Sequence, residues 1–158
     1  MTTHPLPAST IPIAGSAAGV LDLIDRSRSS LAEAYAARGV AERYLAAQLG
    51  ALRAAAALLA VPGRTRPLRR SSGPRNVWEL TATSAPELAE WAGYFAHSTR
   101  QRAEVERGGR RVTSREADDL LRSAETFLDL VTARLGLPGR PGEHPERLLP
   151  AHGGTVSS

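Results

Sequence analysis

Four long segments of the chain repeat apolar side chains at three- and four-residue steps, which is the spacing of an amphipathic helix. Each segment runs for about twenty residues, or roughly 30 Å of helix. The first carries Val20, Ile24, Ser27, Leu31 and Tyr35 and ends at Gly39. The second carries Leu45, Leu49, Leu52, Ala56 and Leu59 and stops before Pro62 and Gly63. We expect each of these stripes to face a common core.

The third and fourth segments begin with sequence signals for a helix N-terminus. Ser84, Pro86 and Glu87 have the spacing of a capping box with proline in the first turn. Thr113 and Glu116 form a second box of the same kind. The third stripe is then Leu88, Trp91, Ala92 and Phe95. The fourth is Ala117, Leu120, Leu121, Ala124, Phe127, Leu128, Val131 and Leu135, and Gly136 ends it.

A short extra helix, residues 76–83, is expected between the second and third long ones. Asn76 is placed to cap it, with Glu79 three residues further on, and Trp78 should anchor it against the end of the bundle. Segments of matched length joined by short connections are typical of an antiparallel bundle. We therefore predict an all-α fold, an up-and-down four-helix bundle with one short extra helix. Its core is expected to hold Trp91, Phe95, Phe127 and Leu128.

The ends of the chain differ in composition from this helical part. Residues 1–16 are rich in proline, threonine and serine, and residues 136–158 contain four prolines and five glycines. Such segments bury too little apolar surface to offset the entropy of ordering them. The sequence therefore predicts disordered tails at residues 1–16 and 136–158, on either side of one bundle domain formed by residues 17–135.

The composition excludes several kinds of site. The chain has no cysteine, which rules out a disulfide scaffold and a thiolate metal site and suits a reducing, cytoplasmic setting. Three of its four histidines, His4, His144 and His152, fall in the predicted tails, so we expect no metal site. No nucleotide-binding fingerprint is present, and no cofactor is expected. The most apolar run spans only about a dozen residues, so we expect no membrane association.

All twenty basic residues are arginine, and five of them lie in an acid-free run, residues 64–75. A high-GC genome would produce this bias, whereas phosphate recognition would retain arginine for its planar fork of donors. In the second case we expect an anion-binding groove that takes RNA or a nucleotide. Its candidate residues are Arg69, Arg70 and Arg75, with Arg43 from the second long helix. The alternative is a solvated loop, because no aromatic residue lies among the arginines to stack on a base.

Two further groups could support catalysis. His97 lies on the third long helix beside Tyr94 and Gln101, where it is either a surface histidine or a proton-transfer group. On the last helix, steps of four, three and four residues separate Asp118, Arg122, Glu125 and Asp129. These are either a carboxylate site or the solvated side of the helix, with Asp118 and Arg122 as an ion pair.

Three stretches, PRNVWEL, APELAEWAGYFA and READDLLRSAETFLDLV, resemble a small actinobacterial branch of the HEPN-domain superfamily. The helix AERYLAAQLGALRAAAALLA is similar to the same branch, and the resemblance covers residues 31–135. It implies an up-and-down helical bundle that commonly dimerises. In many members it also implies a metal-independent RNase of toxin or host-defence type. The RNase signature is an arginine followed a few residues later by a histidine.

The chain matches only the first half of that signature. Arg75, followed by Asn76, resembles the arginine, but Leu, Thr and Ala stand at residues 80–82, where the histidine would fall. None of those three side chains can transfer a proton at neutral pH. The resemblance therefore implies a non-catalytic HEPN module that binds RNA, a nucleotide or a protein partner. The alternatives are an RNase in which Arg75 and His97 act together, and a structural interaction module with no nucleic-acid role.

A homodimer is also expected. Leu130 lies off the main stripe of the last helix, and alanine-rich faces remain on the second. Apolar surface left outside one core indicates a partner, and identical chains usually pair about a two-fold axis. We expect the two copies to meet through helix faces near the arginine run.

Overall fold

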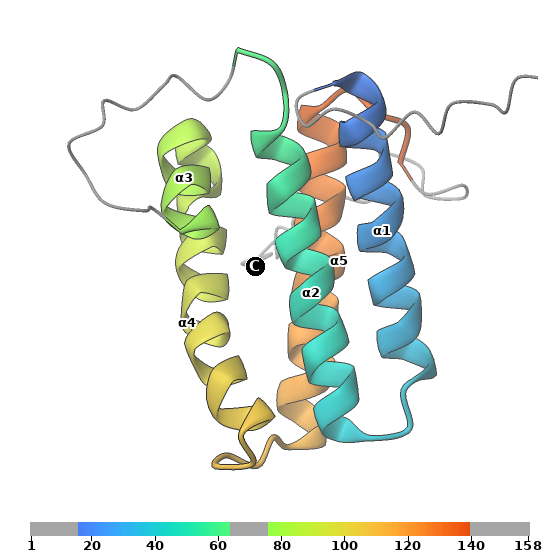
Figure 1. Cartoon of the computed structure of the whole chain (residues 1–158), viewed down its shortest axis with the longest axis vertical. Coiled ribbons are helices and arrows are strands. Elements are labelled where there is room, and N and C mark those ends of the chain that lie inside the picture. The colour runs from blue at the N-terminus through green and yellow to red at the C-terminus, as the bar shows by residue number, and fades with distance from the viewer. Residues whose placement is uncertain (1–15, 64–75, 140–158) are drawn as a thin grey trace, which may run out of the picture.

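The computed structural model describes residues 16–63 and 76–139 (Figure 1). Five α-helices and one 3-10 helix make up this part of the chain, which contains no strand. In order they are α1 (Ala17–Ala36), α2 (Val40–Leu59), α3 (Val77–Ser84), η1 (Pro86–Leu88), α4 (Ala89–Glu106) and α5 (Ser114–Arg134). The predicted all-α bundle of four long helices, with α3 as the short extra one, is confirmed. Most of each predicted tail lies outside the described residues, so the tails stay predictions.

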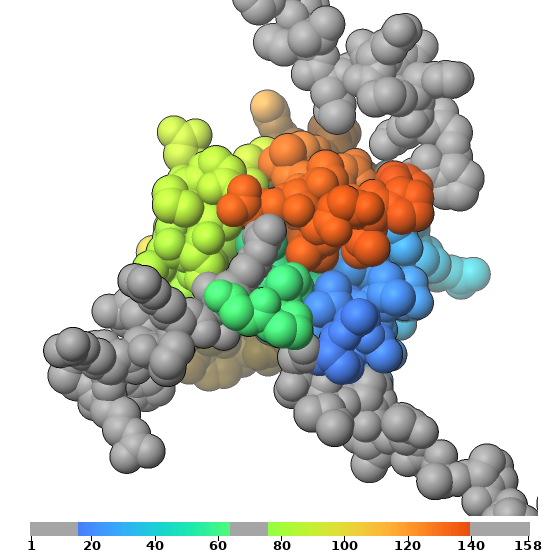
Figure 2. Space-filling model, turned by 90° about the horizontal axis from the view of Figure 1, so that it is seen from above, coloured from blue at the N-terminus to red at the C-terminus, as the bar shows by residue number. Residues whose placement is uncertain are grey.

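The long helices run up and down, and α2 and α5 form the middle of the bundle. Helix α1 packs along one side of this pair, while α3 and α4 cover the other side (Figure 1). Figure 2, which looks along the bundle, shows α1 and α3 on opposite sides of α2 and α5. Helix α2 contacts each of the other four α-helices. Its residues therefore decide how the bundle closes.

The stripe predicted to be buried on α2 is only partly covered, although Leu45 and Leu52 do pack against the core. Its five members, Leu45, Leu49, Leu52, Ala56 and Leu59, are only half-buried. The buried residues of α2 are mostly small, and they are Tyr44, Ala47, Gln48, Gly50, Ala51, Ala54, Ala55, Ala57 and Leu58. Small side chains let helices approach closely. The alanines therefore take the inside of the bundle, and most of the leucines are left on the outer side of α2.

Helices α1 and α2 approach each other closely at Gly50. A Cβ at this position would lie 2.6 Å from Cδ2 of Leu31 and 3.0 Å from its Cγ. Ser27 of α1 donates a hydrogen bond from its Oγ to the carbonyl oxygen of Gly50 at 2.8 Å. Ser27 and Leu31 are both buried. The close contact between α1 and α2 thus favours glycine at this position, because a Cβ would displace the Leu31 side chain.

A cluster of aromatic rings holds α3 against α4 and α5. Trp78 of α3 stacks on Phe95 of α4, with the ring centroids 5.2 Å apart. The Phe127 ring of α5 lies 5.1 Å from Phe95 and 6.1 Å from Trp78. The indole Nε1 of Trp78 also donates a hydrogen bond to Thr99 Oγ1 at 2.8 Å. Trp78 is therefore buried against the bundle and not free in solvent, as expected, with its partners on α4 and α5.

The other core and surface positions predicted from the sequence are confirmed only in part. Phe95, Phe127 and Leu128 are buried. Trp91 is half-buried, with its ring 6.3 Å from Phe95 and 6.4 Å from Phe127. Leu130 was expected to be available to a partner, but it is half-buried and packs against the core. Tyr35 was expected in the core stripe of α1, but it is 64% exposed.

Two predicted ends of α5 are confirmed. The side chain of Thr113 accepts from the backbone N–H of Glu116, and the Glu116 side chain accepts from the backbone N–H of Thr113, which is the predicted capping box. At the other end Gly136 has a φ of +68°, a conformation that favours glycine. The backbone N–H of Leu137 bonds to the carbonyl oxygen of Thr132 at 2.9 Å, as expected after such a turn.

Two other predicted helix ends are wrong. Ser84 is the last residue of α3, and α4 starts only at Ala89, so the box predicted at Ser84 does not form. Proline at position 86 begins the 3-10 turn η1 instead, which separates the two helices. Gly39 was expected to end the first helix, but α1 ends at Ala36 and Gly39 is the N-cap of α2.

Alanine at the two helical glycines should change stability in opposite directions. An added Cβ at Gly93 has nothing within 4 Å. Gly93→Ala should therefore stabilise the protein by about 0.5–1 kcal/mol through helix propensity. Gly50→Ala gains the same propensity, but it displaces the packed Leu31 side chain, which costs about 1–3 kcal/mol and lowers the net free energy of unfolding. Urea unfolding measures both changes, and equal stabilisation by the two variants would contradict the close α1–α2 contact.

Candidate functional site

The site predicted from the RNase-like signature begins at the N-terminus of α3. Asn76 is the N-cap, and its Oδ1 accepts hydrogen bonds from the backbone N–H groups of Trp78 and Glu79, both at 3.0 Å. Its Nδ2 also donates to Glu79 Oε1 at 3.4 Å. These contacts give Asn76 a structural role. The predicted anion-binding residues Arg69, Arg70 and Arg75 lie outside the described residues, so that groove stays a prediction.

The positions of the missing histidine lie on α3. Thr81 is buried, and its hydroxyl donates a hydrogen bond to the carbonyl oxygen of Val77 at 2.8 Å. Leu80 and Ala82 are half-buried. None of these side chains titrates near neutral pH, so this turn of α3 supplies no acid or base.

Arg43 is held by residues far from the arginine run in sequence. Its guanidinium donates to Asp118 Oδ1 at 2.7 Å and to the carbonyl oxygen of Ala37 at 3.3 Å. Arg43 lies near the start of α2, about 24 Å of helix before Leu59, where α2 ends. It therefore ties the α1–α2 turn to α5, and nothing described supports it as part of an anion-binding groove. The predicted pairing of Asp118 with Arg122 is also wrong, because Asp118 pairs with Arg43.

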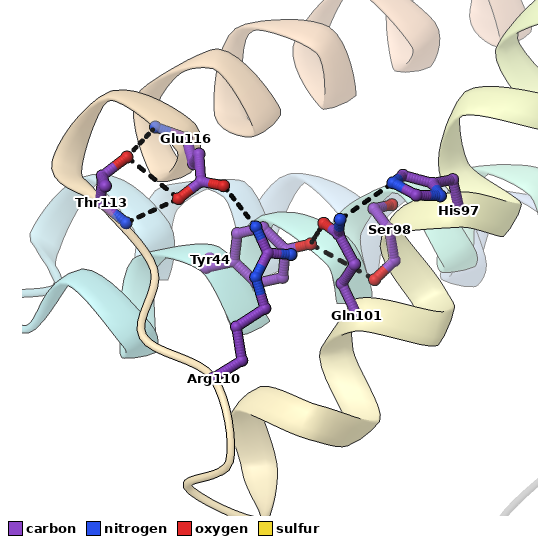
Figure 3. Close-up of polar contacts among 7 residues, drawn as sticks. All are labelled: Tyr44, His97, Ser98, Gln101, Arg110, Thr113 and Glu116. Carbon is purple, nitrogen blue, oxygen red and sulfur yellow. Dashed lines mark hydrogen bonds and ion pairs between the residues drawn. The ribbon is translucent and has the colours of Figure 1, made fainter.

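His97 lies on the exposed side of α4, beside a pocket of about 180 Å³ (Figure 3). The pocket is lined by Tyr44, Tyr94, His97, Ser98, Gln101, Glu116, Asp119 and Leu120. The Nε2 atom of His97 lies 2.9 Å from Nε2 of Gln101. No carboxylate in the described part of the chain bonds to the imidazole ring. The ring thus lacks the acidic partner that usually orients a catalytic histidine.

A hydrogen-bonded network runs from His97 into the bundle. The Tyr44 hydroxyl donates to Gln101 Oε1 at 3.2 Å and approaches the carbonyl oxygen of Ser98 at 3.3 Å (Figure 3). Burial raises the pKa of Tyr44, which keeps its phenol protonated as a donor. Deeper in the bundle, Ser98 Oγ donates to Oε1 of the buried Gln48 at 2.6 Å. The network joins α2 to α4, and its hydrogen bonds give each of these polar residues a structural role.

Glu116 lies at the other side of this pocket, and its carboxylate already forms hydrogen bonds and an ion pair. Its carboxylate accepts hydrogen bonds from the backbone N–H of Thr113 at 2.8 Å and from the Thr113 hydroxyl at 3.0 Å. It also pairs with the Arg110 guanidinium at 2.5 Å (Figure 3). The hydrogen bonds from Thr113, with a smaller effect of Arg110, lower the pKa of Glu116. Glu116 is therefore ionised at neutral pH, and with Asp119 it gives the pocket lining two carboxylates and no arginine.

A larger hollow, here called the α2 groove, lies along the first half of α2, on a side that none of the other described helices covers (Figure 1). It has a volume of about 530 Å³ and runs between the C-terminal parts of α1 and α4. Its apolar floor consists of Ala36, Ala37, Leu45, Ala46 and Leu49. Helical spacing places three further half-buried residues, Leu52, Ala56 and Leu59, along the same side of α2.

The rim of the α2 groove is acidic. Its charged residues are Glu33, Glu42, Arg102 and Glu106. Arg102 and Glu106 pair with each other at 3.0 Å. Glu33 and Glu42 form no ion pair with another described residue. Three carboxylates thus surround this groove with one guanidinium, on a protein whose net charge is +4.

The leucines of the groove were recognised in the sequence but assigned to the core. The sequence also contains a second stripe, made of smaller residues with the same period, which was an alternative candidate for the buried side of α2. It runs through Tyr44, Ala47, Ala51, Ala54 and Leu58. Because both stripes are apolar, their spacing alone does not tell which one is covered.

The described residues offer neither a metal site nor a membrane span. Within residues 16–63 and 76–139, no three histidine or acidic side chains are grouped closely enough to hold a metal ion. None of the helices in these ranges combines the length and the apolar character needed to cross a bilayer.

Comparison with known proteins identifies the family. The model of the HEPN_SAV_6107-like HEPN family matches residues 34–132, which include all of α2, α3 and α4 and most of α5. The chain therefore belongs to this HEPN family. No curated protein and no solved structure matches the chain.

The lowered pKa of Glu116 makes a prediction about acid stability. Its ionised form stabilises the fold above the ordinary pKa of 4.5, and this contribution is lost as the pH falls through the lower pKa of the folded protein. Glu116→Gln keeps the shape of the cap. The variant should therefore lose less stability than the wild type between about pH 7 and about pH 3. Urea unfolding at the two pH values, with the exposed Glu90→Gln as control, measures this, and equal losses in all three proteins would contradict it.

Proposed function

We propose that this HEPN domain is a binding module that does not cleave RNA. The observation that carries the proposal is the position of the missing histidine, where Thr81 is buried and its hydroxyl is bonded to Val77. Metal-independent cleavage needs one group to take the proton of the 2′-hydroxyl and another to protonate the leaving oxygen. Arg75 can stabilise phosphate charge, but it cannot carry out either proton transfer.

His97 is the other candidate for proton transfer, and its surroundings argue against this role. Its imidazole contacts the amide of Gln101 and no carboxylate among the described residues. The adjacent pocket is lined by the carboxylates of Glu116 and Asp119, and the arginines that contact them are already held in ion pairs with these two groups. No arginine lines the pocket itself to receive a phosphate. We therefore assign His97 to the surface of α4, where its contacts are with the polar network.

Two kinds of ligand are consistent with such a module. The acid-free run of arginines in residues 64–75 supports RNA or a nucleotide, because each arginine can neutralise a phosphate. The α2 groove supports a protein partner, because its floor is apolar and open. The homodimer predicted from the sequence remains a proposal, and the half-buried position of Leu130 removes one of its arguments.

Incubation of a fluorescent single-stranded RNA with the purified protein in EDTA tests the proposal. We expect salt-dependent binding and intact RNA. Arg75→Ala should lower the slope of log K against log salt by about one unit. Arg75 is predicted to lie in a surface loop, and removal of one such side chain should hardly change the free energy of unfolding. Asn76→Ala is the matched control, because it should cost about 1 kcal/mol of stability through the lost cap and leave RNA affinity unchanged.

One outcome would overturn the proposed binding module, and another would change its ligand. Robust cleavage that disappears in both Arg75→Ala and His97→Ala would establish an RNase and overturn the binding module. Absence of any RNA binding at low salt would exclude RNA as the ligand and leave a protein partner.

A further inference from the structure

The side of α2 opposite its buried alanines is largely apolar. Residues 45–59 span about 21 Å of helix, and Leu45, Leu49, Leu52 and Leu59 on this side are half-buried. Helices α1 and α4 contribute residues to the walls of the α2 groove, and its outer side is open. A hollow of about 530 Å³ with an apolar floor and charged residues at its border is a candidate binding site for another protein.

The groove suits a helix better than an extended peptide. Its floor and walls are themselves helices, so their backbone N–H and C=O groups are already bonded within each helix. An extended segment would find no backbone partners here, whereas a helix satisfies its own backbone and offers an apolar side. A helix of about 14 residues would match the 21 Å of α2 along which these half-buried leucines lie.

The rim favours a basic partner. Glu33 and Glu42 are exposed and form no ion pair with another described residue. Glu106 adds a third carboxylate, and Arg102 is the single cation on the lining. Because the whole chain has a net charge of +4, this negative patch differs in sign from the protein that carries it. Complementary charge of this kind selects and orients a partner.

We propose that the α2 groove binds a basic amphipathic helix of a protein partner. The apolar side of that helix packs on Leu45 and Leu49, and its lysine or arginine side chains pair with Glu33 and Glu42. This inference rests on the binding function proposed above. It involves none of the residues assigned to RNA or nucleotide binding.

Two synthetic peptides of about 14 residues provide the test, since this length matches the half-buried leucine stripe of residues 45–59. Both carry leucines along one side of the helix; one has lysines at the remaining positions and the other has glutamates. Fluorescence anisotropy with the full chain measures their binding. We expect the lysine peptide to bind at least about tenfold more tightly than the glutamate peptide.

Three variants assign the binding to the groove. Glu33→Lys combined with Glu42→Lys should reverse the preference between the peptides. The matched control, Glu90→Lys combined with Glu104→Lys, adds the same charge at exposed positions outside the groove lining and should leave the preference intact. Leu49→Lys should abolish binding of the lysine peptide, and circular dichroism checks that each variant is folded.

Several results would overturn the inference. One is equal binding of the two peptides, another is a preference that the rim reversal leaves unchanged, and a third is no binding at all. If the free chain is a dimer that Leu49→Lys or the lysine peptide dissociates, the groove binds a second copy and the inference is also wrong. RNA cleavage would overturn the proposed function without changing the peptide result, so the two failures are distinguishable.

Discussion

The small residues of α2 allow the close approach on which the rest of the bundle depends. At Gly50 an added Cβ would lie 2.6 Å from the Leu31 side chain, and most neighbouring buried positions of α2 are alanine. Because α2 contacts all four other α-helices, this surface sets the spacing of the whole bundle. Leu45, Leu49, Leu52 and Leu59 are then left half-buried on the opposite side of α2, where Leu45 and Leu52 still contact the core. The α2 groove therefore follows from the same packing that holds the fold together.

Helices α3 and α4 attach to this centre through aromatic and polar contacts together. Gln48 of α2 is buried, and its Nε2 donates to Thr99 Oγ1 at 2.5 Å while its Oε1 accepts from Ser98. Trp78 of α3 donates to the same Thr99 hydroxyl. Buried polar groups need partners, so this network favours one position of α4 against α2. His97 lies at the outer edge of the network, and this explains its contacts without a catalytic role.

Periodicity predicted the helices well, because each long helix buries one side and repeats apolar residues at that spacing. The same signal failed on α2, where alanines and leucines repeat with one period and both stripes are apolar. Local rules also predicted the cap at Thr113, since its partners are three residues apart. They could not predict the pair between Arg43 and Asp118, whose residues are 75 positions apart in the sequence. The choice between core and groove, and between local and distant ion pairs, is made by the packing of whole helices.

Methyl NMR with a soluble paramagnetic agent tests most directly whether the leucines of α2 line an open groove. Leu58 and Leu59 are neighbours in sequence, but Leu58 is 1% exposed and Leu59 is half-buried on the other side of the helix. The agent should broaden the methyl signals of Leu45, Leu49 and Leu59 strongly and leave those of Leu58 sharp. If the methyl groups of Leu45 and Leu49 are as well protected as those of Leu58, the groove is not open and the packing described for α2 is wrong.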